Sequence, residues 1–139
     1  LIARRPPAGG PAGERILLAS DAGERSDDLV GLGITLAISR GSELLVLHVA
    51  HAESSFQPTR IAQQAARVAD ALGERGRVEV LDGRPKDLVV EAAAREHASL
   101  VVVASRRTAG VRALGSVSER VVHDAPCSVL VVRPEDLPG

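Results

Sequence analysis

Residues 100–122, LVVVASRRTAGVRALGSVSERVV, combine the residue types that could hold an anion. Arg106 and Arg107 follow a short apolar run, and a helix is expected to begin at Ser116, because serine caps helices and Glu119 completes a capping box. A helix N-terminus presents free backbone N–H groups and partial positive charge, and arginine adds bidentate donors. The order of these parts predicts a phosphate-binding loop. The same charges are also typical of a solvated surface loop, and the pattern alone leaves both interpretations open.

Other chemically competent residues do not form a catalytic or metal-binding pattern. His48 and His51 lie near each other in the chain, but two imidazoles cannot complete a metal site and no Cys, Asp or Glu lies at matching spacing. The single Cys127 precedes an apolar run, as a small buried strand residue does, and excludes an internal disulfide. The chain contains no nucleophile elbow and no Walker loop. We therefore expect no catalytic residues and no metal cluster, in a chain suited to the reducing cytoplasm.

The composition restricts the classes of partner. The chain has 139 residues, one Phe, no Trp, Tyr or Met, and a formal net charge of −1. Single-stranded nucleic acid is usually bound on aromatic platforms, which this chain lacks, and the charge gives no general attraction to DNA, RNA or acidic membranes. We expect no nucleic-acid partner, and any bound ring would lie between aliphatic side chains.

Short apolar strands alternate with amphipathic helices along the whole chain. The patterns predict strands at residues 15–20, 43–49, 77–81, 100–104 and 128–132, and helices at 26–39, 58–72, 86–97 and 116–123. This alternation is typical of an α/β domain in which a parallel sheet carries helices on both faces. The domain is expected to span residues 14–139.

Residues 1–13, LIARRPPAGGPAG, are rich in proline and glycine and are predicted to be a flexible lead-in or linker. Arg4 and Arg5 could form the basic flank of a membrane helix that precedes them, and a linker from another soluble domain is the alternative. No apolar run in the chain approaches the ~20 residues that a membrane span requires.

Three segments together resemble the universal stress protein family: residues 16–23 (ILLASDAG), 43–49 (ELLVLHV) and 115–134 (GSVSERVVHDAPCSVLVVRP). The last is the most specific, since it combines Gly-Ser, a helix, Ala-Pro-Cys and a valine-rich strand. The resemblance implies a Rossmann-like fold, with five parallel strands in the order 3-2-1-4-5. It also implies a homodimer paired through the last strand, Ser128 to Val132, and a ligand at the carboxyl ends of strands one and four, where the order reverses.

In the ATP-binding branch of the family, an acidic residue after the first strand contacts the nucleoside, and a loop with the spacing Gly-two-Gly-nine-Gly-Ser holds the phosphates. Asp21 matches the acidic position, and Gly115 and Ser116 match the end of the loop. Ala104 and Arg107 stand where the first two loop glycines are expected, and the interval to Gly115 is about two residues shorter.

These departures have physical consequences. Loop glycines serve where φ is positive or where the backbone must closely approach a phosphate, and another residue forced into such a conformation costs about 1–2 kcal/mol. Arg107 either obstructs the phosphate oxygens or replaces lost N–H contacts with bidentate ones.

The resulting hypothesis is a regulatory domain that binds an adenine nucleotide, ATP or AMP, with magnesium only as a companion of the nucleotide. It is not an enzyme beyond slow, incidental ATP hydrolysis. The residues assigned to the nucleotide are Ser20, Asp21, Val46, His48, Ala104, Arg106, Arg107, Gly115, Ser116, Val117 and Ser118. The alternative is a nucleotide-free dimerisation or interaction domain, such as the cytosolic C-terminal domain of a membrane transporter attached through the lead-in.

Overall fold

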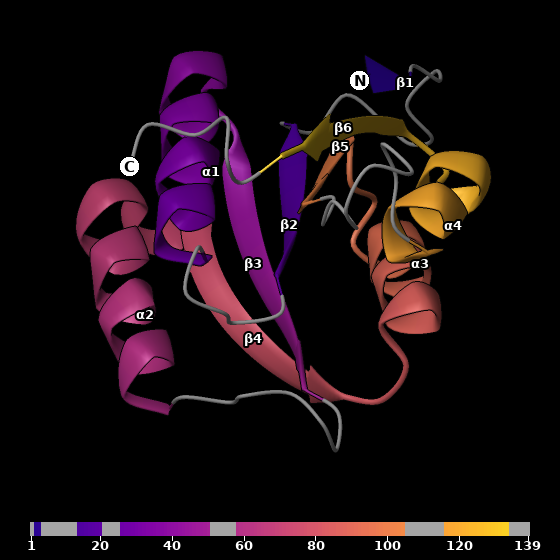
Figure 1. The fold of residues 1–139 in the computed structure, drawn as a ribbon. Helices are drawn as coiled ribbons and strands as arrows, with labels where there is room; N and C mark the ends of the chain where they lie inside the picture. The colour runs from indigo at the N-terminus through magenta and orange to yellow at the C-terminus, as the bar shows by residue number, and fades with distance from the viewer. Residues whose placement is uncertain (1, 4–13, 21–25, 51–57, 105–115, 134–139) are drawn as a thin grey trace.

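The computed structural model describes residues 2–3, 14–20, 26–50, 58–104 and 116–133 (Figure 1). Its elements in chain order are β1 (Ile2–Ala3), β2 (Arg15–Ser20), α1 (Ser26–Arg40), β3 (Glu43–Ala50), α2 (Pro58–Leu72), the 3-10 turn η1 (Gly73–Arg75), β4 (Gly76–Asp82), α3 (Pro85–Arg95), β5 (Leu100–Ala104), α4 (Ser116–Asp124) and β6 (Ser128–Val132). Each predicted strand and helix is present, with bounds that agree to within two residues.

The strands form one sheet in the order β1-β6-β5-β2-β3-β4. The five strands from β2 to β6 are parallel to their neighbours, and numbered among themselves they follow the order 3-2-1-4-5, which confirms the predicted topology. Such connections need a crossover helix between successive strands, and each helix of the alternating pattern supplies one.

The sixth strand, β1, was not predicted. Ile2 pairs with Leu130 and Ala3 with Val129, antiparallel to β6. The prediction that the lead-in stands apart from the fold is therefore wrong for these two residues. Pairing at a sheet edge uses backbone groups, so no pattern of side chains in the sequence predicted this strand. Residues 4–13, with Arg4 and Arg5, lie outside the described part of the chain.

Helices cover both faces of the sheet, as predicted: α1 and α2 lie on one face, and α3 and α4 on the other (Figure 1). Successive strand residues point to opposite faces. Accordingly, Ile16 and Leu18 of β2 pack in the cluster beneath α1 and α2, whereas Leu17 and Ala19 pack in the cluster beneath α3 and α4. A strand that is buried on both faces has to be continuously apolar, which explains the run at residues 16–19.

The helix predicted at 86–97 ends two residues early, at Arg95. His97 has a positive φ of 52°, and its neighbour Ala98 donates its N–H to the carbonyl of Ala93 at 3.0 Å, which closes a Schellman-type turn. Helix α1 ends in the same kind of turn with Gly41, where φ is 63°. Glycine is the usual residue at this position of the turn. Because histidine occupies it here, the sequence pattern did not show where α3 ends.

Candidate functional site

The sheet has one place where its strand order reverses. From β2 the chain proceeds outward through β3 and β4, and then returns to the other side of β2 with β5 and β6. Ala19 of β2 is in register with Val103 of β5, so the carboxyl ends of these two strands lie side by side. Ligands of open α/β sheets bind at such a switch point, because the connections leave in opposite directions and open a crevice.

The first turn of helix α4 contacts the carboxyl end of β5. The hydroxyl of Ser118 donates to the carbonyl oxygen of Ala104 at 3.1 Å, and the Ser118 side chain is buried. This contact brings together two of the predicted site residues and ties the first turn of α4 to the strand end. Val117 packs against the core beneath α3 and α4. The start of α4, with the partial positive charge of a helix N-terminus, therefore lies at the same end of the strands as the switch point.

The other predicted site residues have different positions. Ser20 and His48 are register partners at the ends of β2 and β3, and both side chains are buried. Val46 is fully buried in the cluster beneath α1 and α2. The remaining assignments, Asp21, Arg106, Arg107 and Gly115, and the side chain of Ser116, lie outside what the structure describes.

A chain of hydrogen bonds, buried at His48, Gln64 and Ser26, joins β3 to both helices on its face. His48 Nε2 lies 2.7 Å from Gln64 Oε1, and Gln64 Nε2 donates to Ser26 Oγ at 2.9 Å and to Asp27 Oδ1 at 2.6 Å. Because the amide nitrogen of Gln64 serves two acceptors, its oxygen must face the imidazole, and His48 donates from Nε2. His48 Nδ1 is then an unprotonated acceptor, and it is buried without a partner among the described residues.

Sequence reasoning identified His48 but not Gln64. The signal was present, since Gln64 is spaced four residues from Val68 and eight from Leu72, the two buried apolar positions of α2. A polar side chain on the buried stripe of an amphipathic helix has to find a hydrogen-bond partner inside the protein. Only the fold could show that this partner is His48.

Two arginines of α2 also reach the first turn of α1. Arg60 Nη1 pairs with Asp27 Oδ2 at 3.0 Å, and Arg67 Nη1 donates to the backbone oxygen of Asp27 at 3.0 Å. Together with Gln64, these contacts fix the start of α1 against α2 and the end of β3. Helix α1 begins five residues after Asp21 in the chain.

Burial lowers the pKa of His48 below its ordinary value of 6.5, against the opposing effects of the Gln64 hydrogen bond and the Asp27 charge. An unfolded chain therefore binds a proton at His48 more readily than the folded chain does. We expect this residue to contribute stability that is full above pH 6.5 and is lost as the pH falls from 6.5 toward the lower pKa of the folded state. Urea unfolding at several pH values between 7 and about 5 measures this dependence.

The substitution His48→Gln keeps a donor for Gln64 but does not titrate, so it should flatten the stability profile over this window. Gln63→Asn, an amide substitution at an exposed position of α2, is the control and should keep the wild-type slope. A wild-type slope in His48→Gln would contradict the assignment. The Arg40 hydrogen bond holds the pKa of Glu14 below 4.5, so this carboxylate acts at lower pH than His48.

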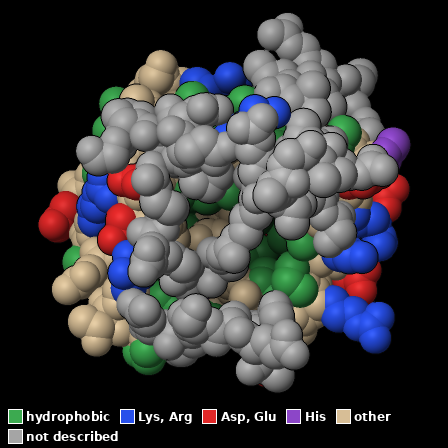
Figure 2. All heavy atoms as spheres, viewed as in Figure 1, with side chains coloured by type: hydrophobic (Ala, Val, Ile, Leu, Met, Phe, Trp, Pro, Cys, Tyr) green, Lys and Arg blue, Asp and Glu red, His purple; other side chains and the backbone are tan. Residues whose placement is uncertain are grey.

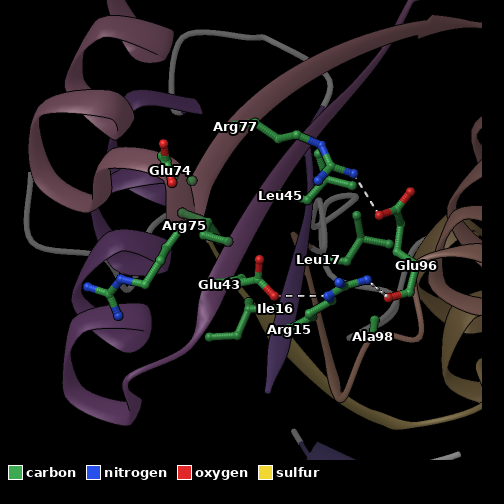
Figure 3. Close-up of a pocket in the computed structure, with 12 residues that line it drawn as sticks. Arg15, Ile16, Leu17, Glu43, Leu45, Glu74, Arg75, Arg77, Glu96 and Ala98 are labelled. Atoms are coloured by element: carbon green, nitrogen blue, oxygen red, sulfur yellow. Dashed lines mark hydrogen bonds and ion pairs between the residues drawn. The ribbon is translucent and has the colours of Figure 1, made fainter. Parts of the chain in front are cut away.

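A small pocket lies at the opposite end of the strands from the switch point, around the amino ends of β2, β3 and β4 (Figure 3). Its charged rim is closed by ion pairs: Arg15 Nε lies 3.0 Å from Glu43 Oε2, and Arg77 Nη2 lies 2.6 Å from Glu96 Oε1. The cavity of about 20 Å³ has room for a water molecule rather than a nucleotide. Because these ion pairs are partly exposed, each contributes at most about 1 kcal/mol to stability.

Three further observations concern charge, metal binding and membrane-spanning helices. On the face shown in Figure 2, the basic and acidic side chains of the described residues are interspersed, in keeping with the near-neutral net charge. No group of three or more His, Cys, Asp or Glu side chains suited to a metal ion occurs in the described ranges. Of the helices that the structure describes, none has both the length and the apolar character needed to cross a bilayer.

The parallel sheet, the two helical layers and the switch point define an open, doubly wound α/β domain of the Rossmann-like class. The profile of the universal stress protein family matches residues 13–133, and the chain therefore belongs to this family. The recognition made from residues 16–23, 43–49 and 115–134 is confirmed.

Relatives support this membership over nearly the full chain. A universal stress protein from Thermus aquaticus, described as lying in the QAH/OAS sulfhydrylase 3' region, is 30% identical over 133 residues, which cover 85% of this chain and 97% of the relative. A universal stress protein from Methanothermobacter thermautotrophicus is 27% identical over 139 aligned residues and covers 86% of this chain and 95% of its own length.

Solved structures share the fold. A universal stress protein in complex with cAMP superposes with a TM-score of 0.71 at 22% identity, covering 88% of this chain and 98% of its own. The universal stress protein from Archaeoglobus fulgidus in complex with dAMP superposes with a TM-score of 0.64 at 19% identity, covering 86% of this chain and 98% of its own.

Proposed function

We propose that this chain is a regulatory domain that binds an adenine nucleotide at the carboxyl ends of β2 and β5. The observation that carries the proposal is the start of α4 beside the end of β5, held by the Ser118–Ala104 hydrogen bond of 3.1 Å at the switch point of the sheet. Two structurally similar family members are complexes with cAMP and dAMP, which supports the choice of an adenine nucleotide.

The proposed roles follow the parts of the nucleotide. Asp21, with Ser20, contacts the nucleoside, and the end of β3 around Val46 and His48 borders the base. The phosphate group is assigned to the loop after β5 and the first turn of α4, with Ala104, Arg106, Arg107, Gly115, Ser116, Val117 and Ser118. Arginine can donate two parallel hydrogen bonds to a phosphate, so the loop arginines can replace backbone donors that the missing glycines would have positioned.

The proposed role is sensing rather than catalysis. ATP or AMP occupies the site, Mg²⁺ enters only with the nucleotide, and occupancy alters the contacts of the domain with a second copy or another protein. The second copy pairs through the outer edge of β6. A ligand shifts a protein toward the conformation that it binds more tightly, which is the physical basis of such a response.

The test is thermal unfolding of the 139-residue chain with ATP, AMP or cAMP, in the presence of Mg²⁺. A ligand at a hundred times its Kd should add about 2.7 kcal/mol to the stability, which raises the unfolding midpoint by several degrees. No shift with any of the three would overturn the binding proposal. That result would favour a nucleotide-free interaction domain, for which attachment to a membrane transporter could then be tested.

A pair of variants connects any shift to the proposed site. Asp21→Asn should weaken nucleotide affinity by about tenfold or more, because it removes a charged hydrogen-bond acceptor. Asp70→Asn makes the same change at an exposed position of α2 and should leave the affinity unchanged. Equal affinities in the two variants would place the ligand elsewhere on the protein.

A further inference from the structure

The two edges of the sheet differ in their protection against pairing with another chain. The edge strand β4 carries Arg77, Glu79 and Asp82 along its seven residues. Charged side chains on an edge strand discourage a further strand from adding to it. At the other side of the five parallel strands, β6 reads SVLVV and carries no charge and no proline. Its sequence therefore leaves that edge competent to accept another strand.

The structure shows a strand already paired with that edge. β1 runs antiparallel to β6, with Ile2 opposite Leu130 and Ala3 opposite Val129, and lies beside β6 in Figure 1. It pairs with two of the five residues of β6. The outer backbone groups of β6 thus accept an antiparallel strand, and the chain's own first residues supply one.

A second copy of the chain requires the same backbone groups. Two identical strands that pair about a two-fold axis must run antiparallel, which is also the orientation of β1. Pairing of β6 with its copy centred on Leu130 would place Leu130 opposite its counterpart and Val129 opposite the copy's Val131. These positions include both residues of β6 that pair with β1. Because each edge backbone group completes its hydrogen bond with one strand, the two pairings exclude each other.

We propose that β1 is a built-in competitor of dimerisation: Ile2–Ala3 occupies the β6 edge in the monomer and leaves when a second copy pairs there. This inference rests on the proposed dimer through β6. A two-residue strand is easily released, and the dimer replaces its two residue pairs with up to five. The strand β1 therefore sets the concentration at which the domain dimerises.

The test compares dimer dissociation constants by sedimentation equilibrium over a range of protein concentrations. The double substitution Ile2→Pro and Ala3→Pro removes the backbone N–H groups of β1, so it should release the edge and strengthen the dimer by about tenfold. The matched control places the same two prolines at Ala8 and Gly9, outside β1, and should dimerise like the wild type. Equal dissociation constants in all three chains would overturn the inference.

A further variant distinguishes failure of this inference from failure of the proposed dimer. Leu130→Cys places a thiol at the centre of the two-fold pairing, where the two residues are close enough for a disulfide between copies. Oxidation should crosslink the dimer, more completely in the Ile2→Pro and Ala3→Pro background. A dimer that forms without this crosslink uses another surface, which would overturn the proposed β6 dimer. No dimer in any variant would overturn both proposals.

Discussion

Replacing Gly76 with alanine is expected to destabilise the domain by about 3 kcal/mol, because the added methyl group enters space that α2 already fills. A Cβ atom at this position would lie 2.5 Å from Val68 Cγ1 and 3.1 Å from both Cβ and Cδ1 of Leu72. Val68 is fully buried and Leu72 nearly so, so the overlap has to be relieved within a closely packed core. Urea denaturation gives the change in the free energy of unfolding.

The matched control is Gly31→Ala in α1. There the nearest atoms to an added Cβ belong to the guanidinium of Arg67, the flexible end of an exposed side chain, which can shift at the expense of its hydrogen bond to the Asp27 carbonyl oxygen. Since alanine favours a helix by about 1 kcal/mol over glycine, which offsets the loss of this exposed hydrogen bond, the variant should keep nearly wild-type stability. A Gly76→Ala variant of wild-type stability would contradict the packing described for β4 and α2.

A double variant tests the cause of the Gly76 effect. Val68→Ala removes Cγ1, the atom that an alanine at position 76 would meet most closely. It destabilises by itself, because it leaves a cavity in the core. If the overlap is the cause, Val68→Ala combined with Gly76→Ala should lose less stability than the sum of the two single variants. Additive losses would point to a backbone effect instead.

The second large effect is expected from Gln64→Leu, which should cost about 1–3 kcal/mol. Leucine has a similar volume, but its side chain is one bond shorter and leaves the buried Nε2–H of His48 without the acceptor that now lies at 2.7 Å. Ser26 and Asp27 also lose their shared donor. Forming a hydrogen bond adds only modestly to the stability of the protein. Removing one partner costs more, because the buried partner that remains keeps its full desolvation penalty.

Two comparisons make this prediction specific. Gln63→Leu, the same substitution at the neighbouring exposed position of α2, should stay within about 0.5 kcal/mol of the wild type. Replacing both His48 and Gln64 with leucine removes donor and acceptor together and should recover most of the stability lost in Gln64→Leu. A double variant less stable than Gln64→Leu would show that the imidazole contributes through packing rather than through this hydrogen bond.

The switch point could be anticipated from the chain because its parts are local. The apolar run of β5, the capping box at Ser116 and the family resemblance together predicted a helix start beside a strand end, and the Ser118–Ala104 contact shows the two together. The assignments of Asp21, Arg107 and the other nucleotide contacts remain predictions. These residues are assigned by their contacts with a ligand, so their roles depend on the ligand as well as on the chain.

The amino-acid sequence by itself determined the elements, their order and the parallel sheet. Hydrophobic periodicity, capping residues and turn residues act over a few positions, and the bounds of α2, β5 and β6 agree with those expected from them. Only the tertiary structure decided what lies far apart in the chain: β1 on the edge of β6, and His48 opposite Gln64. Backbone pairing at an edge leaves no pattern of side chains in the sequence, and the sequence does not show which partner a buried polar residue will have. The pairing of β1 and the contact of His48 with Gln64 therefore depended on the assembled fold.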